Sequence, residues 1–167
     1  SIKFDVGDVE MGVPTNTEIL TIFNSLDSAT SDTLETQHPE FKPWTGPKDD
    51  MAVAVEYATC FANGDGCVII FGVSDKVIGR KNAIHGADGY NIDTWRRGIH
   101  DGIKPHLPIS VEELPVPEGT GRLLIIRLSK GEAPPYGTVR GLFKRRVGKN
   151  CMPMDPAEFV SSRISTG

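Results

Sequence analysis

The feature that most constrains the fold of this chain is a continuous apolar run, CVIIFGV, which spans residues 67–73 between Gly66 and Ser74. A short apolar run rich in β-branched residues is typical of a strand that is buried on both faces. Such a strand needs neighbouring strands at its edges and further elements packed on both sides. At 167 residues, the chain is long enough to build one domain around it.

Shorter patterns predict the elements around this strand. Thr15 and Glu18 form a capping box at a helix start, and a Gly-containing turn at 117–121 joins two apolar strands as an antiparallel hairpin. The expected helices are 15–26, 51–63, 92–103 and one from 155, and the other expected strands are 40–44, 109–116, 123–128 and 142–147. This order predicts an α+β fold with a mixed, largely antiparallel sheet and helices packed on it. Residues 1–30 would form an N-terminal helical extension, and residues 31–167 the main domain.

Several classes of protein are disfavoured by what the sequence lacks. No apolar run approaches the roughly 18 residues of a membrane span, and no signal peptide or P-loop is visible. We therefore expect a cytoplasmic protein with no membrane partner and no nucleotide cofactor. Its cysteines, Cys60, Cys67 and Cys151, are odd in number and widely spaced. They predict free thiols in a reducing compartment, with neither a disulfide framework nor a zinc site.

The charge is unevenly distributed along the chain. Residues 1–120 carry a net charge of −10 and residues 121–167 a net charge of +6, although the whole chain has a net charge of −4 and a pI near 5.5. This basic excess is either a solvated strand face or a phosphate-binding patch on an otherwise acidic protein. Most of it comes from Arg140, Lys144, Arg145, Arg146 and Lys149.

Glu40-Phe41-Lys42 is the first candidate for chemistry. Residues two apart on a strand face the same side, so the Glu40 carboxylate and the Lys42 ammonium would emerge together while Phe41 points into the core. Metal-dependent nucleases use such a Glu-x-Lys arrangement, in which the carboxylate holds a divalent ion and the lysine assists the attacking water or the developing charge. The bare tripeptide is more often a surface salt pair.

Two further carboxylates could complete a site with Glu40. Asp75 directly follows the buried strand, where open sheets place ligands, although it could also be a turn-forming residue. Glu35 precedes Glu40 by five residues, so the two converge only if the chain bends between them, which His38-Pro39 allows. Carboxylates gathered without a cation repel one another, and a bound Mg²⁺ or Mn²⁺ would remove that cost.

Six segments, spread over about residues 33–160, resemble the motifs of the Schlafen AlbA-like domain family and occur in the same order. Cys67 stands where a second glycine is usual. The six segments are Glu35-x4-Glu40-Phe41-Lys42, Phe61-Ala62-Asn63 with Gly66, Ile70 to Asp75 with Ile78-Gly79, Ile103-Lys104-Pro105, Pro134-Pro135-Tyr136, and Phe143 to Asn150.

The resemblance implies a nucleic-acid-binding fold. Some Schlafen members are metal-dependent endoribonucleases that cut transfer and ribosomal RNA, whereas many relatives are described only as DNA-binding or regulatory proteins. Carried over by position, the active carboxylates would be Glu35, Glu40 and Asp75, which would bind Mg²⁺ or Mn²⁺. The Schlafen zinc-binding set has no counterpart here. The animal enzymes pair two lobes, so this chain would need a homodimer or a related lobe to form a cleft.

Three functions follow from these observations. The first is binding of RNA or DNA by the five basic residues, with Trp44 or Tyr136 stacking on a base. The second is divalent-metal-dependent cleavage of structured RNA such as tRNA by Glu35, Glu40 and Asp75, assisted by Lys42. The third is a regulatory or assembly role within a larger transcriptional regulator. Binding ranks first because the first two functions share it.

Overall fold

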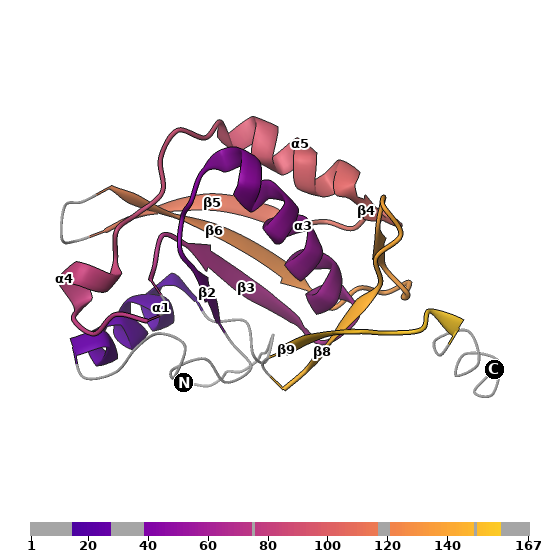
Figure 1. The fold of residues 1–167 in the computed structure, drawn as a ribbon, viewed down its shortest axis with the longest axis horizontal. Coiled ribbons are helices and arrows are strands. Elements are labelled where there is room, and N and C mark those ends of the chain that lie inside the picture. Colours follow the sequence, from indigo (N-terminus) through magenta and orange to yellow (C-terminus); the bar gives the residue numbers. More distant parts are fainter. Residues whose placement is uncertain (1–14, 28–38, 75, 117–120, 149, 158–167) are drawn as a thin grey trace.

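The computed structural model describes residues 15–27, 39–74, 76–116, 121–148 and 150–157, and its ribbon is drawn in Figure 1. Glu35, Asp75 and Lys149 therefore lie outside the described residues. The helices are α1 (Asn16–Phe23), the 3-10 helix η1 (Asn24–Asp27), α3 (Pro47–Ala62), α4 (Arg80–Ala83) and α5 (Ile92–Gly102). The strands are β2 (Glu40–Lys42), β3 (Gly66–Phe71), β4 (Ile103–Lys104), β5 (Ser110–Pro115), β6 (Arg122–Ser129), β7 (Gly137–Thr138), β8 (Lys144–Val147) and β9 (Asn150–Pro153).

The main sheet has four strands in the order β2-β3-β6-β5. β2 runs parallel to β3, while β3 and β5 both pair antiparallel with β6. The apolar run of the sequence is thus an inner strand, and Ile69 and Ile70 lie opposite Ile126 and Ile125 of β6. The expected α+β class, with a mixed and mostly antiparallel sheet, is confirmed, as is the antiparallel pairing of β5 with β6.

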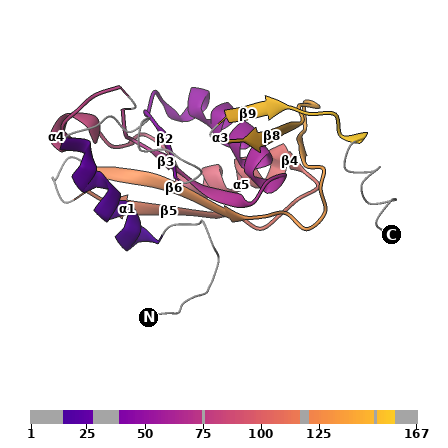
Figure 2. The ribbon, with the colours of Figure 1, turned by 90° about the horizontal axis from the view of Figure 1, so that it is seen from below.

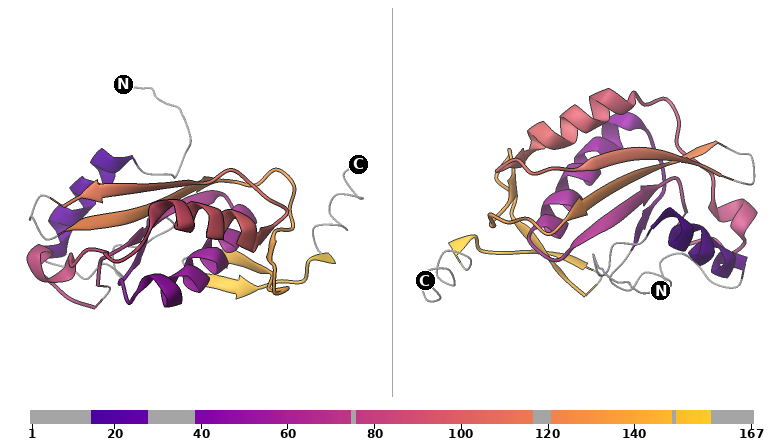
Figure 3. Two further views of the ribbon diagram at one scale, coloured as in Figure 1. Left: turned by 90° about the horizontal axis from the view of Figure 1, so that it is seen from above. Right: turned by 180° about the vertical axis from the view of Figure 1, so that it is seen from behind.

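Each face of the sheet is covered by a separate apolar cluster. Figure 2 shows α1 on one side of the sheet and α3 on the other. Side chains alternate along a strand, so Ile69 and Phe71 face α3 and α5, whereas Val68 and Ile70 face α1. This two-sided burial is the physical reason why β3 contains no polar residue. The views from above and behind in Figure 3 place α1 and α5 on opposite sides of the sheet.

Helix α1 is held to the sheet by its own apolar stripe. Its capping box is formed: the Glu18 amide donates to Thr15 Oγ1 at 3.2 Å and the Thr15 amide donates to Glu18 Oε1 at 2.8 Å. Ile19, Phe23 and Leu26 are fully buried in the same cluster as Phe41. Part of residues 1–30 therefore packs against the core of the main domain.

Several element boundaries differ from the sequence-based expectation, and two of these differences have a clear physical reason. Strand β3 ends at Phe71 rather than residue 73, because Gly72 has φ +111° and a Cβ there would come within 2.9 Å of the Gly86 main chain. Helix α3 begins at Pro47, before Asp49 and Asp50, because proline suits the first turn of a helix. Asp50 instead turns back and accepts hydrogen bonds from the amides of Thr45 and Gly46, at 2.7 and 3.2 Å.

The expectation of three free thiols is wrong. Cys60 on α3 and Cys151 on β9 form a disulfide across 91 residues of sequence, with their Cα atoms 6.0 Å apart, and only Cys67 remains a thiol. Wide spacing in the sequence concealed the pair, because β9 returns to α3 only through the tertiary fold. The cysteines therefore no longer support a reducing compartment.

Within the described ranges, every helix falls short of the length and apolar character needed to cross a membrane. The short helix expected from residue 155 lies largely outside the described residues. Its first turn begins at Asp155, whose carboxylate accepts a hydrogen bond from the Ala157 amide at 2.9 Å.

Candidate nucleic-acid interface

The basic segment folds as a two-stranded hairpin of its own, separate from the main sheet. The sequence predicted one strand over 142–147, whereas the structure pairs β8 with β9 antiparallel. The burial of β8 alternates: Lys144 and Arg146 are partly covered by the body of the protein, while Arg145 and Val147 are exposed. The hairpin thus has an inner face against α3 and an outer face toward solvent.

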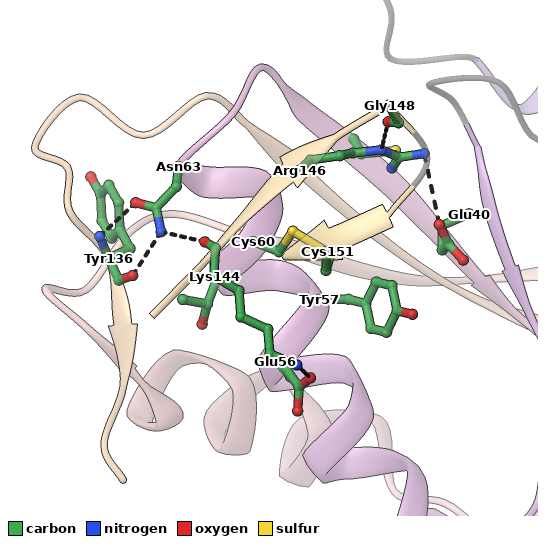
Figure 4. Close-up of a disulfide and its surroundings, with 12 residues drawn as sticks. Glu40, Glu56, Tyr57, Cys60, Asn63, Tyr136, Lys144, Arg146, Gly148 and Cys151 are labelled. Carbon is green, nitrogen blue, oxygen red and sulfur yellow. Dashed lines mark hydrogen bonds and ion pairs between the residues drawn. A yellow bond between two sulfur atoms is a disulfide. The ribbon is translucent and has the colours of Figure 1, made fainter. Parts of the chain in front are cut away.

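Asn63, at the end of α3, connects the hairpin and the preceding loop to the body (Figure 4). Its Nδ2 donates to the carbonyls of Tyr136 and Lys144, both at 2.8 Å, and its Oδ1 accepts from the Tyr136 amide at 2.7 Å. Nearby, the Lys144 ammonium forms an ion pair with Glu56 on α3. These side-chain contacts attach the inner face to α3.

Arg146 occupies the centre of this inner face, and its side chain is only 8% exposed. Its guanidinium lies over the Phe61 ring, 4.6 Å from the centroid, while Nε donates to the Gly148 carbonyl at 2.9 Å. A terminal nitrogen lies 3.7 Å from Glu40 Oε1. Most of the hydrogen-bonding surface of Arg146 thus faces the protein itself (Figure 4).

Glu40 and Lys42 have the geometry that their spacing predicts. Phe41 is buried beneath the sheet, and the two charged side chains share the opposite face, with Lys42 Nζ 3.3 Å from Glu40 Oε2. Glu40 is a buried carboxylate, 4% exposed, with cations on two sides. This pairing offsets much of the cost of burying its charge.

Tyr57 on α3 is a third member of this cluster that the sequence analysis missed. The Lys42 ammonium donates to the Tyr57 hydroxyl at 2.9 Å and lies 4.1 Å from the centre of its ring. Burial favours the neutral amine, but the hydrogen bond to Tyr57 and the Glu40 carboxylate outweigh it and raise the pKa of Lys42 above its usual 10.5. Lys42 is thus held as an ammonium ion. The signal that the sequence offered for Tyr57 was its position in the helix expected over 51–63, and this did not indicate a contact with Lys42.

The metal-binding hypothesis depends on residues that the structure does not place. Glu35 and Asp75 are outside the described ranges, so their convergence with Glu40 stays a prediction. In the part of the chain that is described, no group of three or more His, Cys, Asp or Glu side chains is positioned to hold a metal ion. Glu40 is the one predicted ligand described, and its carboxylate already contacts Lys42 and Arg146.

The two aromatic residues proposed to stack on a base are differently placed. Tyr136 is 3% exposed, and its hydroxyl accepts from the Ala133 amide at 3.0 Å, so the stacking hypothesis is wrong for Tyr136. Trp44 is partly exposed, but its ring packs on Phe71 and Trp95 and its indole N–H donates to the Asp88 carbonyl at 2.9 Å. Both side chains primarily support the core.

Exposed side chains of a different kind gather near the hairpin. Of the five large apolar side chains that are exposed in the described residues, four lie between positions 139 and 152, so the apolar exposure coincides with the basic segment. Arg140 and Arg145 are exposed in the same segment. The four apolar residues are Val139, Leu142, Val147 and Met152.

The model of the Schlafen AlbA_2 family matches residues 35–155, which is most of the chain. This chain belongs to the Schlafen AlbA_2 family. The family is one of nucleic-acid-related domains, and its motifs include the Glu40 and Asn63 segments described above. The suspected family is therefore confirmed.

A solved structure supports the same fold. The DIP2311 protein from Corynebacterium diphtheriae superposes with a TM-score of 0.65 at 23% sequence identity, over 88% of this chain. The aligned part is only 32% of that protein, so the Schlafen AlbA_2 chain spans about a third of the length of its solved neighbour. Among curated proteins, none matches the sequence.

The tertiary structure explains how separate Schlafen AlbA_2 motifs act together here. The Asn63 motif binds the Tyr136 motif through the amide described above, and the Glu40 motif meets the basic hairpin through Arg146. Segments that lie 73 and 106 residues apart in sequence therefore meet in the tertiary structure.

Proposed function

We propose that this chain binds RNA or DNA through the outer face of the β8–β9 hairpin and the turn that precedes it. The observation that carries the proposal is the joint exposure of Arg140 and Arg145 with four apolar side chains. Between Glu132 and Asp155 the sequence contains no acidic residue. A segment with several bases and no acids of its own favours an anionic partner.

The side chains on this outer face suit both parts of a nucleic acid strand. Guanidinium groups such as that of Arg145 bind phosphate in a bidentate manner. Exposed aliphatic side chains such as Val147 and Met152 suit the faces of unstacked bases. Strands with unpaired bases, in loops or ends, are therefore the favoured targets.

The four described members of the five predicted basic residues fall into two groups. Arg140 and Arg145 project into solvent and would contact phosphates, whereas Lys144 and Arg146 face α3 and Glu40 and would hold the hairpin in place. Lys149 lies outside the described residues, so its contribution stays a prediction.

Fluorescence anisotropy with a labelled single-stranded RNA and its DNA equivalent tests the proposal. Each phosphate contact should add roughly −0.7 to the slope of log K against log salt concentration for a single strand. Arg145→Ala should weaken binding and make that slope shallower. Arg97→Ala, which removes an exposed arginine on α5, is the matched control and should change neither quantity. Affinity that is insensitive to salt, or equal for both variants, would contradict the proposal.

A second candidate function, metal-dependent cleavage of structured RNA, is favoured by the contact between Glu40 and Lys42. A lysine held as an ammonium ion next to a carboxylate can stabilise charge that develops on a phosphate during cleavage. This function requires Mg²⁺ or Mn²⁺ on Glu40 together with Glu35 and Asp75. Glu40 would have to exchange at least one of its two cationic neighbours for the metal ion.

A further inference from the structure

We propose that the Cys60–Cys151 disulfide is a redox-sensitive crosslink that sets the position of the β8–β9 hairpin, and of Arg146 within it, relative to Glu40. The inference rests on the proposed function for its effect on nucleic acid binding. Its structural part concerns the hairpin alone and can be tested without any nucleic acid.

The hairpin depends on side chains for its attachment. β8 and β9 form a two-stranded sheet that does not pair with the four-stranded sheet. An isolated two-stranded hairpin is at best marginally stable in water. In the described structure its anchors to α3 are the Asn63 amide, the Lys144–Glu56 ion pair, the Arg146–Phe61 contact and the disulfide. Only the last of these is covalent.

The crosslink acts on Arg146 through the strand register. Cys151 on β9 is the direct cross-strand partner of Arg146 on β8. Residues opposite each other on an antiparallel pair share one face, so the disulfide draws that face, and the arginine with it, onto α3. Phe61, which packs under the guanidinium, directly follows Cys60 in α3. The bond from Cys60 to Cys151 therefore lies beside the contact between Arg146 and Glu40 (Figure 4).

The redox step is an exchange with a dithiol reductant. Cys151 is partly exposed and Cys60 fully buried, so a thiolate of the dithiol attacks the Cys151 sulfur and the Cys60 thiolate leaves and takes up a proton. The second thiol of the reductant then displaces Cys151 and takes the reductant to its own disulfide. Two electrons and two protons thus pass from the dithiol to the two cysteines.

The third cysteine does not take part in this exchange. Cys67 is buried, and burial raises the pKa of its thiol to about 12, although Arg146 next to it acts in the opposite direction. A thiol in that state carries almost no thiolate at neutral pH and is a poor nucleophile. Cys60 and Cys151 are therefore the pair of cysteines that this exchange reduces and reoxidises.

Opening the crosslink should weaken nucleic acid binding. With the disulfide closed, Arg145 and Val147 are presented on a fixed strand, whereas a released hairpin must be ordered again when it binds. Ordering a few side chains and a turn corresponds to a loss of about tenfold in affinity.

Limited trypsin digestion of the full chain tests the structural part. Oxidised protein should resist cleavage after Arg146, and protein treated with dithiothreitol should be cut there at least tenfold faster, as followed by mass spectrometry after alkylation. Cys151→Ala should be cut at the fast rate with or without dithiothreitol. Thiol titration of unfolded protein should give one thiol after oxidation and three after reduction. Three thiols after oxidation, or equal cleavage rates in the wild type, would overturn the proposal.

Anisotropy with the labelled single-stranded RNA separates this inference from the function on which it rests. Tighter binding by oxidised than by reduced protein, with no such difference in Cys151→Ala, supports both. Salt-dependent binding that is equal in the two redox states overturns the redox effect and leaves the function standing. Absence of binding together with redox-dependent trypsin cleavage overturns the function and leaves the crosslink standing. If Cys151→Ala does not fold, the comparison of oxidised with reduced wild type still decides.

Discussion

Asn63 and Tyr136 hydrogen-bond to each other in both directions: the Tyr136 amide donates to Asn63 Oδ1 at 2.7 Å, and Asn63 Nδ2 donates to the Tyr136 carbonyl at 2.8 Å. The Asn63 side chain thus pairs with the main chain of Tyr136 in the way that a neighbouring strand would. Its second Nδ2 hydrogen bond, to the Lys144 carbonyl, extends the contact to the basic hairpin. The Asn63 amide thus connects the end of α3 to the loop at Tyr136 and to strand β8 at Lys144.

Asn63→Ala should lower the free energy of unfolding by about 3 kcal/mol. The substitution removes three hydrogen bonds and leaves main-chain groups of Tyr136 buried without partners, each of which costs about 1–3 kcal/mol. Urea unfolding followed by circular dichroism gives the value. Asn82→Ala, at an exposed position on α4, is the control and should stay within about 0.5 kcal/mol of wild type. Equal losses of stability in Asn63→Ala and Asn82→Ala would show that the Asn63 hydrogen bonds do not stabilise the fold.

The contact between Glu40 and Arg146 should appear as an energetic coupling. Removing either partner leaves the other buried charge with less compensation, so Glu40→Gln and Arg146→Met should each destabilise the fold by about 3 kcal/mol, even though Lys42 remains beside Glu40 in the second variant. The double variant should lose less than the sum, with a coupling of about 1 kcal/mol or more. Urea unfolding of all four proteins measures this cycle. Additive losses would mean that the 3.7 Å separation carries no net interaction.

Tyr57→Phe should lower the pKa of Lys42. Phenylalanine keeps the ring beneath the ammonium and removes only the hydroxyl that accepts its proton at 2.9 Å. In the variant, burial still disfavours the charged Lys42 ammonium, and the hydrogen bond that opposed this effect is missing. The pH titration of the Lys42 Cε resonance should have its midpoint above 10.5 in the wild type and a lower midpoint in the variant. An unchanged midpoint would assign the raised pKa to Glu40 alone.

The direction of the pKa shift also determines how Lys42 contributes to stability. Its pKa is higher in the folded than in the unfolded chain, so its stabilising contribution is complete below pH 10.5 and is lost as the pH rises through the folded pKa. The stability difference between wild type and Tyr57→Phe should accordingly shrink at strongly alkaline pH. Urea unfolding on both sides of pH 10.5 measures this difference.

If the chain cleaves RNA, Glu40→Gln should abolish the activity. The amide has nearly the shape of the carboxylate but is a much weaker ligand for Mg²⁺ or Mn²⁺. Purified protein is incubated with tRNA and Mn²⁺, and the products are resolved on a denaturing gel. Glu132→Gln, at an exposed acid, is the matched control and should cleave like wild type. Cleavage that persists in Glu40→Gln would point to a contaminant or to another site.

The two cationic neighbours of Glu40 differ in whether the sequence could predict them. The spacing of Glu40 and Lys42 predicted that they share one side of a strand, and the structure places them 3.3 Å apart. The presence of Arg146 on the same carboxylate was not predictable. It depends on how the hairpin of β8 and β9 packs on the body of the protein, and the disulfide partner of Cys151 has no local signature in the sequence.

The basic segment illustrates the same limit. Counting charges indicated five basic residues, but not that Lys144 and Arg146 turn inward while Arg140 and Arg145 turn outward. The alternation along a strand was foreseeable, but the side on which α3 would lie was not. Likewise, the position of Tyr136 just before the basic segment suggested that its ring could stack on a base. In the structure, Tyr136 is buried and its main chain hydrogen-bonds to Asn63.

By itself, the sequence determined the longer helices and strands, the inner position of β3, the α+β class and the family, but not the short elements α4, β4, β7 and β9. These follow from local patterns, because apolar periodicity, caps and turn residues act over a few positions along the chain. Only the tertiary structure decided that Cys60 binds Cys151, that Arg146 reaches Glu40, and which arginines face solvent. Those pairings join segments about a hundred residues apart, and their geometry arises only when the hairpin packs on α3.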